Sequence, residues 1–236
     1  IQDTIDLVKA NKGVQVEFDN DMNDPKVYKL WQDGNSVGIF QFESQGMTNF
    51  MKELKPDCLE DIIAGVSLYR PGPMDQIPRY IANKKDPEHA VYTHPALKPI
   101  LKVTYGCMVY QEQVMQIVRD LAGYSLGRAD LVRRAMGKKK LDVMAREREI
   151  FINGQLDEDG NIVVPGCVRN GIDAESANRI FDEMAEFAKY AFNKSHAAAY
   201  AVVSYRTAYL KAYYPAEFMA ATLNSFLGNL DKIPDY

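Results

Sequence analysis

Residues 192–215 read Phe-Asn-Lys-Ser-His-Ala-Ala-Ala-Tyr-Ala-Val-Val-Ser-Tyr-Arg-Thr-Ala-Tyr-Leu-Lys-Ala-Tyr-Tyr-Pro and decide the fold class of this chain. Small side chains recur along this stretch at helical spacing, at Ala197, Ala201, Ser204, Ala208 and Ala212. A bulkier stripe of Tyr205, Tyr209 and Tyr213 lies beside them, because residues four apart share one side of a helix. The pattern predicts a long helix whose small face lets another part of the chain approach closely.

Four polar residues, Asn193-Lys194-Ser195-His196, stand where this helix is expected to begin. The first backbone N–H groups of a helix lack intrahelical partners and attract anions, and Lys194 adds a positive charge beside them. The tetrad therefore predicts either an anion-binding helix start or an ordinary cap on a buried helix. The local pattern leaves both alternatives open.

Helical patterns dominate the rest of the chain, so we expect a mainly α fold with little strand. Helices are predicted at 25–31, 57–66, 114–121, 126–136, 141–152, 173–187 and after Pro215. Asp57 and Glu60 are expected to form the capping box of the second of these helices. The alternation of residues 37–42 indicates one short strand. Residues 153–171 contain three turn dipeptides around Ile162-Val163-Val164 and predict a short surface β-hairpin.

Composition restricts the classes of function. The formal net charge of −4 argues against a globally basic nucleic-acid binder but leaves a local basic face possible. The three cysteines lie far apart without a C-x-x-C pair, which favours reduced thiols in the cytoplasm and no structural zinc. No apolar run approaches the ~18 residues of a membrane span, so no membrane partner is expected.

A local basic face is predicted at residues 128–149. Eight basic residues stand there against four acidic ones; the basic ones are Arg128, Arg133, Arg134, Lys138, Lys139, Lys140, Arg146 and Arg148. Arg134 and Lys138 are four apart and share a helical face, and arginine binds phosphate oxygens in a forked geometry. The segment suits a triphosphate or a nucleic-acid backbone. The alternative is a solvated helix face with intrahelical ion pairs.

Five runs of sequence resemble, in order, the fingers region of the bacterial replicative DNA polymerase alpha subunits, the C-family polymerases of DnaE type. One is the 192–215 stretch. The others are Ile39-Phe40-Gln41-Phe42-Glu43-Ser44, Leu68-Tyr69-Arg70-Pro71-Gly72-Pro73, Tyr110-Gln111-Glu112-Gln113-Val114-Met115-Gln116 and Arg133-Arg134-Ala135-Met136-Gly137-Lys138-Lys139. Together they cover roughly residues 30–225, which makes the resemblance specific although each run alone is weak.

The resemblance implies a helical fingers domain that binds the incoming dNTP and primer–template DNA. Its implied limits are a helix and linker from the palm at 1–24, fingers at 25–214 with the 153–171 hairpin inserted, and the next helical segment at 215–236. Arg133 and Arg134 would contact the triphosphate, with Lys138, Lys139 and Lys140 lining the same channel. Asn193, Lys194, Ser195 and His196 would lie near the nucleotide. Arg70 would face the palm or hold its own loop.

The resemblance also implies what lies elsewhere. The family joins nucleotides with Mg²⁺ held by an Asp-x-Asp palm motif. Asp19-Asn20-Asp21 stands in a polar loop, so we assign Asp19 and Asp21 to turn and capping roles and expect no catalytic residue or metal in this chain. The chain starts at Ile1 and is expected to be an inactive piece of a nucleotidyltransferase that binds other replisome subunits elsewhere.

A second hypothesis is a stand-alone, non-catalytic helical module that binds nucleic acid. An Asp-x-Asp motif upstream of Ile1 would favour the polymerase, and a native start codon near Ile1 would favour the module. We further expect Trp31, Phe40 and Phe42 in the core and a structural role for Glu112 at a helix N-terminus.

Overall fold

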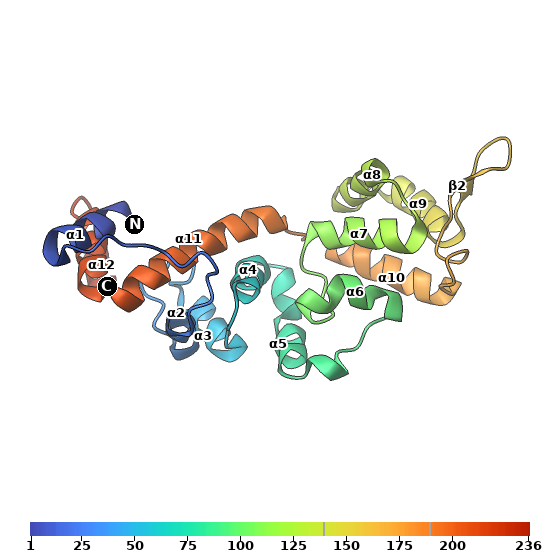
Figure 1. Ribbon diagram of the computed structural model, residues 1–236. Coiled ribbons are helices and arrows are strands. Elements are labelled where there is room, and N and C mark those ends of the chain that lie inside the picture. Colours follow the sequence, from blue (N-terminus) through green and yellow to red (C-terminus); the bar gives the residue numbers. More distant parts are fainter. Residues whose placement is uncertain (139, 189) are drawn as a thin grey trace. The chain divides into compact units, whose positions relative to one another are not determined.

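The computed structural model describes residues 1–138, 140–188 and 190–236 (Figure 1). The α-helices are α1 (Gln2–Lys12), α2 (Pro25–Asp33), α3 (Gln45–Leu54), α4 (Leu59–Leu68), α5 (Ile77–Lys85), α6 (Lys98–Leu101), α7 (Gln111–Ala122), α8 (Leu126–Gly137), α9 (Leu141–Asn153), α10 (Ala174–Phe187), α11 (Lys194–Tyr213) and α12 (Pro215–Ser225). The strands are β1 (Gln155–Leu156) and β2 (Ile162–Val164), and short 3₁₀ turns include η1 (Pro73–Gln76). The mainly α fold with one short hairpin confirms the prediction.

The described residues form two compact units. One combines Ile1–Val66 with Ser195–Tyr236, and the other is Ser67–Lys194. None of the helices in the described ranges is long and apolar enough to cross a membrane.

In the first unit, the small face of α11 is buried as predicted, at Ala197, Ala201, Ser204 and Ala208. The segment 37–42 lies against it. The Ser204 hydroxyl donates to the carbonyl of Phe40 at 2.8 Å, and the Phe40 N–H donates to Thr207 Oγ1 at 3.1 Å. The expected strand at 37–42 is wrong, because these residues form turns whose backbone groups are paired with helix side chains instead of a neighbouring strand.

Tyrosine hydroxyls of α11 form hydrogen bonds with the loop that precedes α2. Tyr205 donates its hydroxyl to Asp19 Oδ2 at 3.0 Å and accepts from the Asp24 N–H, also at 3.0 Å. Tyr213 donates to Asp24 Oδ2 at 2.6 Å. Asp19 also accepts from the N–H of Asn23, which confirms its turn role, and Asp24 caps α2. The carboxylates of this loop therefore serve the fold.

Aromatic side chains make the core of the same unit. Trp31 and Phe42 are fully buried with ring centroids 5.6 Å apart, which confirms their predicted core positions. Phe40 is only half-buried, and its ring lies 5.3 Å from that of Tyr200. Phe40 therefore forms the edge of this cluster and not its centre.

In the second unit, helices α7, α8, α9 and α10 pack around one apolar core (Figure 1). Helix α7 ends where predicted, because Gly123 takes a left-handed conformation with φ 77°. A Cβ there would come within 2.6 Å of Pro165. Glycine is needed at this position for its backbone angle and for the close approach of the segment that follows the hairpin.

The hairpin is exposed at one end and buried at the other. Residues Ile162 and Val163 of β2 are 57% and 51% exposed, whereas Val164 is 2% exposed and Cys167 is fully buried. The N–H of Cys167 donates to the carbonyl of Phe151 at 2.8 Å. This differs from the surface position expected for all of 153–171, because the end of the hairpin closes the core of α7 to α10.

Neighbouring valines of β2 provide a matched test. We expect Val164→Ala to lower the free energy of unfolding by roughly 1–3 kcal/mol, since it removes buried methyl groups and leaves a cavity. Val163→Ala should change it by less than about 0.5 kcal/mol. Denaturant unfolding of both variants measures the difference, and equal losses would contradict the burial of only one of the two residues.

Candidate functional site

Residues from four of the five sequence runs meet where α7 begins. The N–H of Gln111 donates to the carbonyl of Phe192 at 2.9 Å, and its side-chain amide donates to the carbonyl of Ala191 at 2.9 Å. Tyr110 and Phe192 form a parallel β-bridge. We call this place, made by Arg70, residues 110–112, Arg133 and residues 191–194, the α7 junction.

The carboxylate of Glu112 occupies the start of α11. The backbone N–H of Lys194 donates to Glu112 Oε2 at 3.1 Å and Oε1 at 3.2 Å, and Asn193 Nδ2 donates to Oε1 at 2.9 Å. The Glu112 carboxylate, an anion of the protein itself, therefore occupies the helix start at which a bound anion is predicted. Of the two alternatives, capping applies to Asn193 and to the backbone of Lys194. The structural role expected for Glu112 serves the start of α11 as well as its own helix.

The side chains of the tetrad differ in their surroundings. Lys194 is half-buried, and its Nζ lies 5.1 Å from the centre of the Tyr110 ring. Ser195 and His196 fall in the other compact unit and are exposed. The His196 ring lies 4.3 Å from the ring of Tyr200. The backbone at the start of α11 is thus committed to capping, whereas two of the tetrad's side chains face solvent.

The two adjacent arginines of α8 have different roles. Arg133 donates through Nε and Nη2 to Asp130 and through Nη1 to Gln111 Oε1 at 2.9 Å, and its side chain is 22% exposed. Arg134 pairs with the other oxygen of Asp130 at 2.7 Å but is 62% exposed. The hydrogen bond from Arg133, followed by that from Arg134, holds the pKa of Asp130 below its ordinary value. Arg133 therefore ties α8 to the α7 junction, and Arg134 faces solvent.

Arg70 approaches the same junction from the loop after α4. Its guanidinium lies 3.7 Å from the centre of the Phe192 ring, a cation–π contact, while the residue remains exposed. Its backbone carbonyl accepts from the N–H of Met74, which begins the turn of η1. The alternative that Arg70 holds its own loop is thus supported by the contact with the Phe192 ring. Among the described residues, no hydrogen bond from its side chain to a loop carbonyl supports it.

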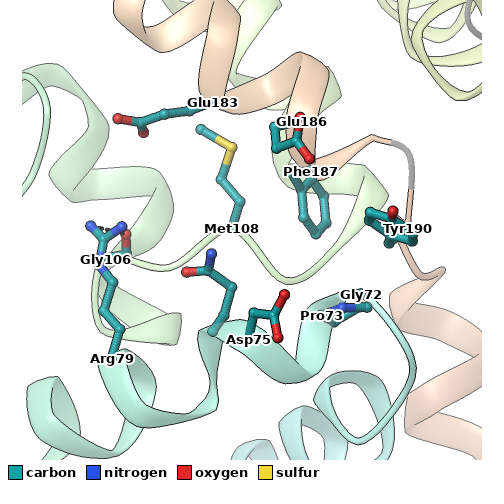
Figure 2. Close-up of a pocket in the computed structure, with 11 residues that line it drawn as sticks. Gly72, Pro73, Asp75, Arg79, Gly106, Met108, Glu183, Glu186, Phe187 and Tyr190 are labelled. Carbon is teal, nitrogen blue, oxygen red and sulfur yellow. Dashed lines mark hydrogen bonds between the residues drawn. The ribbon is translucent and has the colours of Figure 1, made fainter.

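A pocket of about 280 Å³ lies in the same unit, next to the Gly72-Pro73 turn (Figure 2). Its walls carry Asp75, Glu183 and Glu186. Carboxylates repel phosphate, so this pocket does not suit a nucleotide triphosphate.

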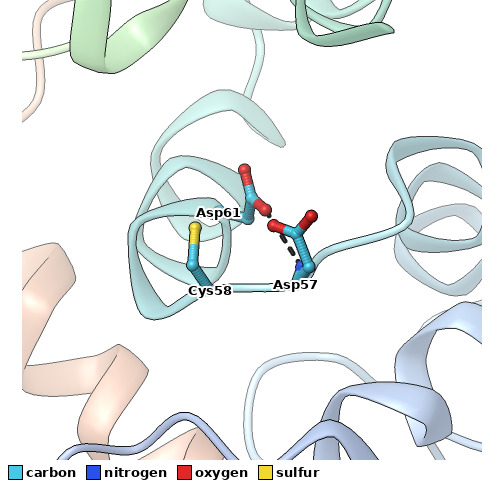
Figure 3. Close-up of side chains that lie close together, drawn as sticks. All are labelled: Asp57, Cys58 and Asp61. Atoms are coloured by element: carbon cyan, nitrogen blue, oxygen red, sulfur yellow. Dashed lines mark hydrogen bonds between the residues drawn. The ribbon is translucent and has the colours of Figure 1, made fainter.

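Asp57, Cys58 and Asp61 place three ligand-type atoms within 4.8 Å of one another (Figure 3). Burial, followed by the charge of Asp61, raises the pKa of Cys58 to about 11, so its thiol is protonated near neutral pH. Mg²⁺ prefers oxygen ligands and water, and a thiol is a poor substitute. This group therefore does not fit the Mg²⁺ of a polymerase.

The buried carboxylate of Asp61 has a structural role. It accepts from the backbone N–H of Asp57 at 3.1 Å, just before α4. The reciprocal bond of the capping box was expected from Glu60, and the structure uses its neighbour Asp61 instead. Asp61 lies on the side of the helix that faces the core, since it is fully buried.

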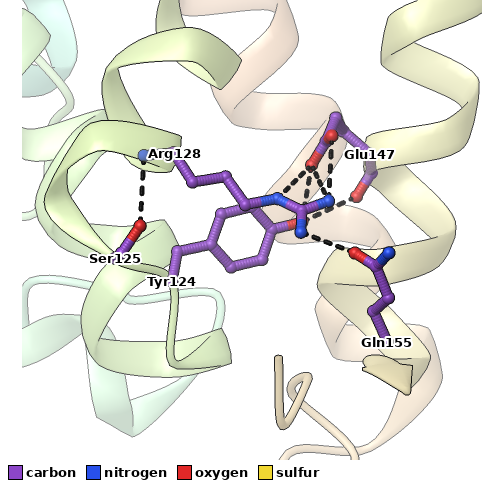
Figure 4. A network of polar contacts seen from close by, with 5 residues as sticks. All are labelled: Tyr124, Ser125, Arg128, Glu147 and Gln155. Carbon is purple, nitrogen blue, oxygen red and sulfur yellow. Dashed lines mark hydrogen bonds and ion pairs between the residues drawn. The ribbon is translucent and has the colours of Figure 1, made fainter. Parts of the chain in front are cut away.

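Part of the basic segment is structural. Arg128 pairs with Glu147 at 3.1 Å and donates to Gln155 at 2.6 Å, which joins α8, α9 and β1 (Figure 4). Burial, followed by the charge of Glu147, raises the pKa of Tyr124, so its hydroxyl stays protonated and donates to Glu147. Arg148 likewise joins α9 to α10.

The remaining basic side chains of the segment face solvent. Arg134, Lys138, Lys140 and Arg146 are exposed at the end of α8 and on α9. Lys139 lies outside the described residues. The intrahelical ion pairs of the alternative are found at Arg133 and Arg134, which both pair with Asp130, whereas the pairs of Arg128 and Arg148 join different helices. The exposed cations at the end of α8 and the start of α9 are the part of the segment that can meet an external phosphate.

Glu112 provides a test of the α7 junction. We expect Glu112→Ala to lower the free energy of unfolding by roughly 1–3 kcal/mol, because it removes the acceptor of three hydrogen bonds. Hydrogen exchange at the Lys194 amide should become faster in the same variant. Glu158→Ala, in the exposed hairpin loop, is the control and should change neither quantity. Unchanged protection of the Lys194 amide would show that Glu112 does not hold the start of α11.

Comparison with known proteins gives one consistent family. The family model for the bacterial DNA polymerase III alpha subunit finger domain matches residues 1–159. The DNA polymerase III subunit alpha of Thermus aquaticus is 50% identical over 98% of this chain and 18% of its own length. Those of Xylella fastidiosa (54% identical, 90% of this chain, 17% of the relative) and Rickettsia felis (50%, 99% and 18%) are similar. The chain thus spans about a fifth of the length of these curated relatives, and it belongs to the family of bacterial DNA polymerase III alpha subunit finger domains.

Proposed function

We propose that this chain is the fingers part of a replicative DNA polymerase and contacts the incoming dNTP and the primer–template DNA during template-directed DNA synthesis. Family membership supports the role in replication. The observation that carries the binding role is the exposed cationic group of Arg134, Lys138 and Lys140 at the end of α8 and the start of α9. Phosphate recognition relies on such side chains.

Arg134 is the residue we assign to the triphosphate. Its ion pair with Asp130 is largely exposed, and exposed pairs contribute little to stability, so phosphate can replace Asp130 at small cost. Arg133 would have to release Gln111 and Asp130 to do the same. We therefore assign Arg133 to positioning α8 on the α7 junction.

The other residues implied by the resemblance are assigned different roles in this proposal. Lys138 and Lys140, with Lys139 between them in sequence, supply point charges for phosphates. Ser195 and His196 face solvent and are proposed to contact the nucleotide, whereas Asn193 and Lys194 shape the start of α11. Arg70 is proposed to contact DNA or the palm from its place over Phe192.

Catalysis belongs to the remainder of the polymerase in this proposal. Mg²⁺ would be held by palm carboxylates outside this chain, since Asp19 and Asp61 are used in a turn and a helix start and Cys58 does not fit that ion. Other replisome subunits would bind outside this chain, and the polymerase would act in the cytoplasm. The alternative, a non-catalytic module, would use the same exposed cations, and an Asp-x-Asp motif found upstream would decide against it.

The two arginines can be separated by kinetics and stability. In a full-length alpha subunit that carries this chain, Arg134→Ala should lower kcat/KM for single-nucleotide incorporation by roughly 30- to 1000-fold, the effect of losing ~2–4 kcal/mol of transition-state stabilisation. Its melting temperature should stay the same. Arg133→Ala, in contrast, should lower the melting temperature, because it breaks a half-buried contact.

Arg146→Ala is the control for both arginine variants, since it removes an exposed positive charge from the neighbouring helix α9. It should incorporate nucleotides nearly normally. Near-normal incorporation by Arg134→Ala would return the whole segment to a structural role.

The chain alone should show no template-dependent primer extension with Mg²⁺ and four dNTPs. Its DNA binding should be weak and should fall steeply with salt, because a local basic face binds mainly through counterion release. Titration of primer–template DNA at several salt concentrations measures this. Extension above background would contradict the absence of the catalytic carboxylates, and tight, salt-insensitive binding would contradict the phosphate-contact model.

A further inference from the structure

The acidic pocket of the Ser67–Lys194 unit has features of a ligand site that the polymerase role does not use. One wall is η1 and the start of α5, and the facing wall is the last turns of α10 (Figure 2). Its volume of about 280 Å³ is near the lower end of the ~300–1,000 Å³ typical of small-molecule sites. A ligand of one ring or a short chain would fill it.

The base and one end of the pocket are apolar. Met108 is buried, Phe187 is half-buried and the Tyr190 ring closes one end (Figure 2). Gly72 has φ 102°, and a Cβ on it would lie 2.4 Å from the Tyr190 ring. The absence of a side chain at Gly72 is therefore what allows the Tyr190 ring to form this wall.

The polar lining is dominated by carboxylates on both walls. Asp75 projects from η1, while Glu183 and Glu186, three residues apart, share a face of α10 (Figure 2). The basic residue of the lining, Arg79, donates to the backbone carbonyls of Val91 and Gly106 at 3.2 and 3.4 Å. Among the lining residues that the structure describes, three carboxylates and one guanidinium sum to a formal charge of −2, and one of the carboxylates, Glu183, also accepts a hydrogen bond from the Thr93 hydroxyl.

We propose that this pocket binds a small organic cation, an ammonium, amidinium or guanidinium group attached to a flat or short apolar body. The charged group would lie between Asp75 and the two glutamates, and the body would pack on Phe187, Tyr190 and Met108. Aromatic faces attract cations, and carboxylates accept their N–H groups, so both parts of the lining favour the same ligand. None of the lining residues is among those assigned to nucleotide and DNA, and the inference goes beyond the proposed function.

Three compounds of one shape test the charge requirement. Benzamidine, benzamide and benzoate share a ring and a planar head and carry a positive, zero and negative charge. Titrated into the ¹⁵N-labelled chain, benzamidine should shift the amide signals of Gly72, Gly106 and Met108, with a Kd on the order of 1 mM or tighter. Benzamide and benzoate should not shift them at the same concentrations. Equal shifts from all three compounds, or none from benzamidine, would overturn the proposal.

Variants locate the site. Asp75→Asn should weaken benzamidine binding roughly threefold to tenfold, because it removes one carboxylate from an exposed position without touching the core. Glu175→Gln, on the first turn of α10 and outside the pocket, is the matched control and should bind normally. Gly72→Ala should abolish binding by displacing Tyr190. If that variant is less stable in a melting curve, Asp75→Asn still decides, and normal binding by Asp75→Asn would sink the assignment.

A peptide could present the same chemistry, and a further arm separates the two sources. N-acetyl-arginine amide carries a guanidinium on a backbone that mimics a protein segment. We expect it to bind no more tightly than benzamidine. Tighter binding would replace the small-molecule assignment with a basic side chain of another protein.

Discussion

The contact between the Glu112 carboxylate and the first turn of α11 is the interaction on which the candidate site depends. It pairs with the backbone N–H of Lys194 and with the side chain of Asn193, and the adjacent Gln111 binds residues 191 and 192. The end of the segment after α10 is therefore fixed to the start of α7. Because a protein carboxylate already fills the helix start, a phosphate group would have to displace it, so the proposed recognition of phosphate would rely on side chains instead.

The basic side chains divide into a partly buried and an exposed set, and the division follows their partners. Arg128 and Arg148 join helices across the core of α7 to α10, and each has a partner on another helix. Arg134 and Lys138 face water at the end of α8. An arginine that holds two helices together cannot also move to a ligand without loosening them. The paired arginines thus hold in place the helices that carry the exposed cations, and such support would help these cations to position a phosphate if they bind one.

Most helix positions, the hairpin and the small face of α11 could be predicted from the sequence, because each follows from local periodicity and turn residues. Helix α5 (Ile77–Lys85) could not, because prolines interrupt the pattern around it. The segment 37–42 could not, since alternation does not reveal that Ser204 and Thr207, far along the chain, would satisfy its backbone. The partnership of Glu112 with Lys194 is hidden for the same reason. The acidic pocket could not be predicted, because Asp75 and Glu183 are more than a hundred residues apart in the sequence and line one pocket only after the chain has folded.

Charge separation within one unit would allow a chain of net charge −4 to contact nucleic acid as proposed. At physiological ionic strength, exposed charges interact strongly only within a Debye length of about 8 Å. Phosphate therefore responds to the local set of Arg134, Lys138 and Lys140 more than to the sum over the chain. The carboxylates of the pocket lie on η1 and α10, and the exposed cations lie at the end of α8 and the start of α9. Surfaces of opposite sign can thus occur on different helices of one unit, and each would favour ligands of the opposite charge.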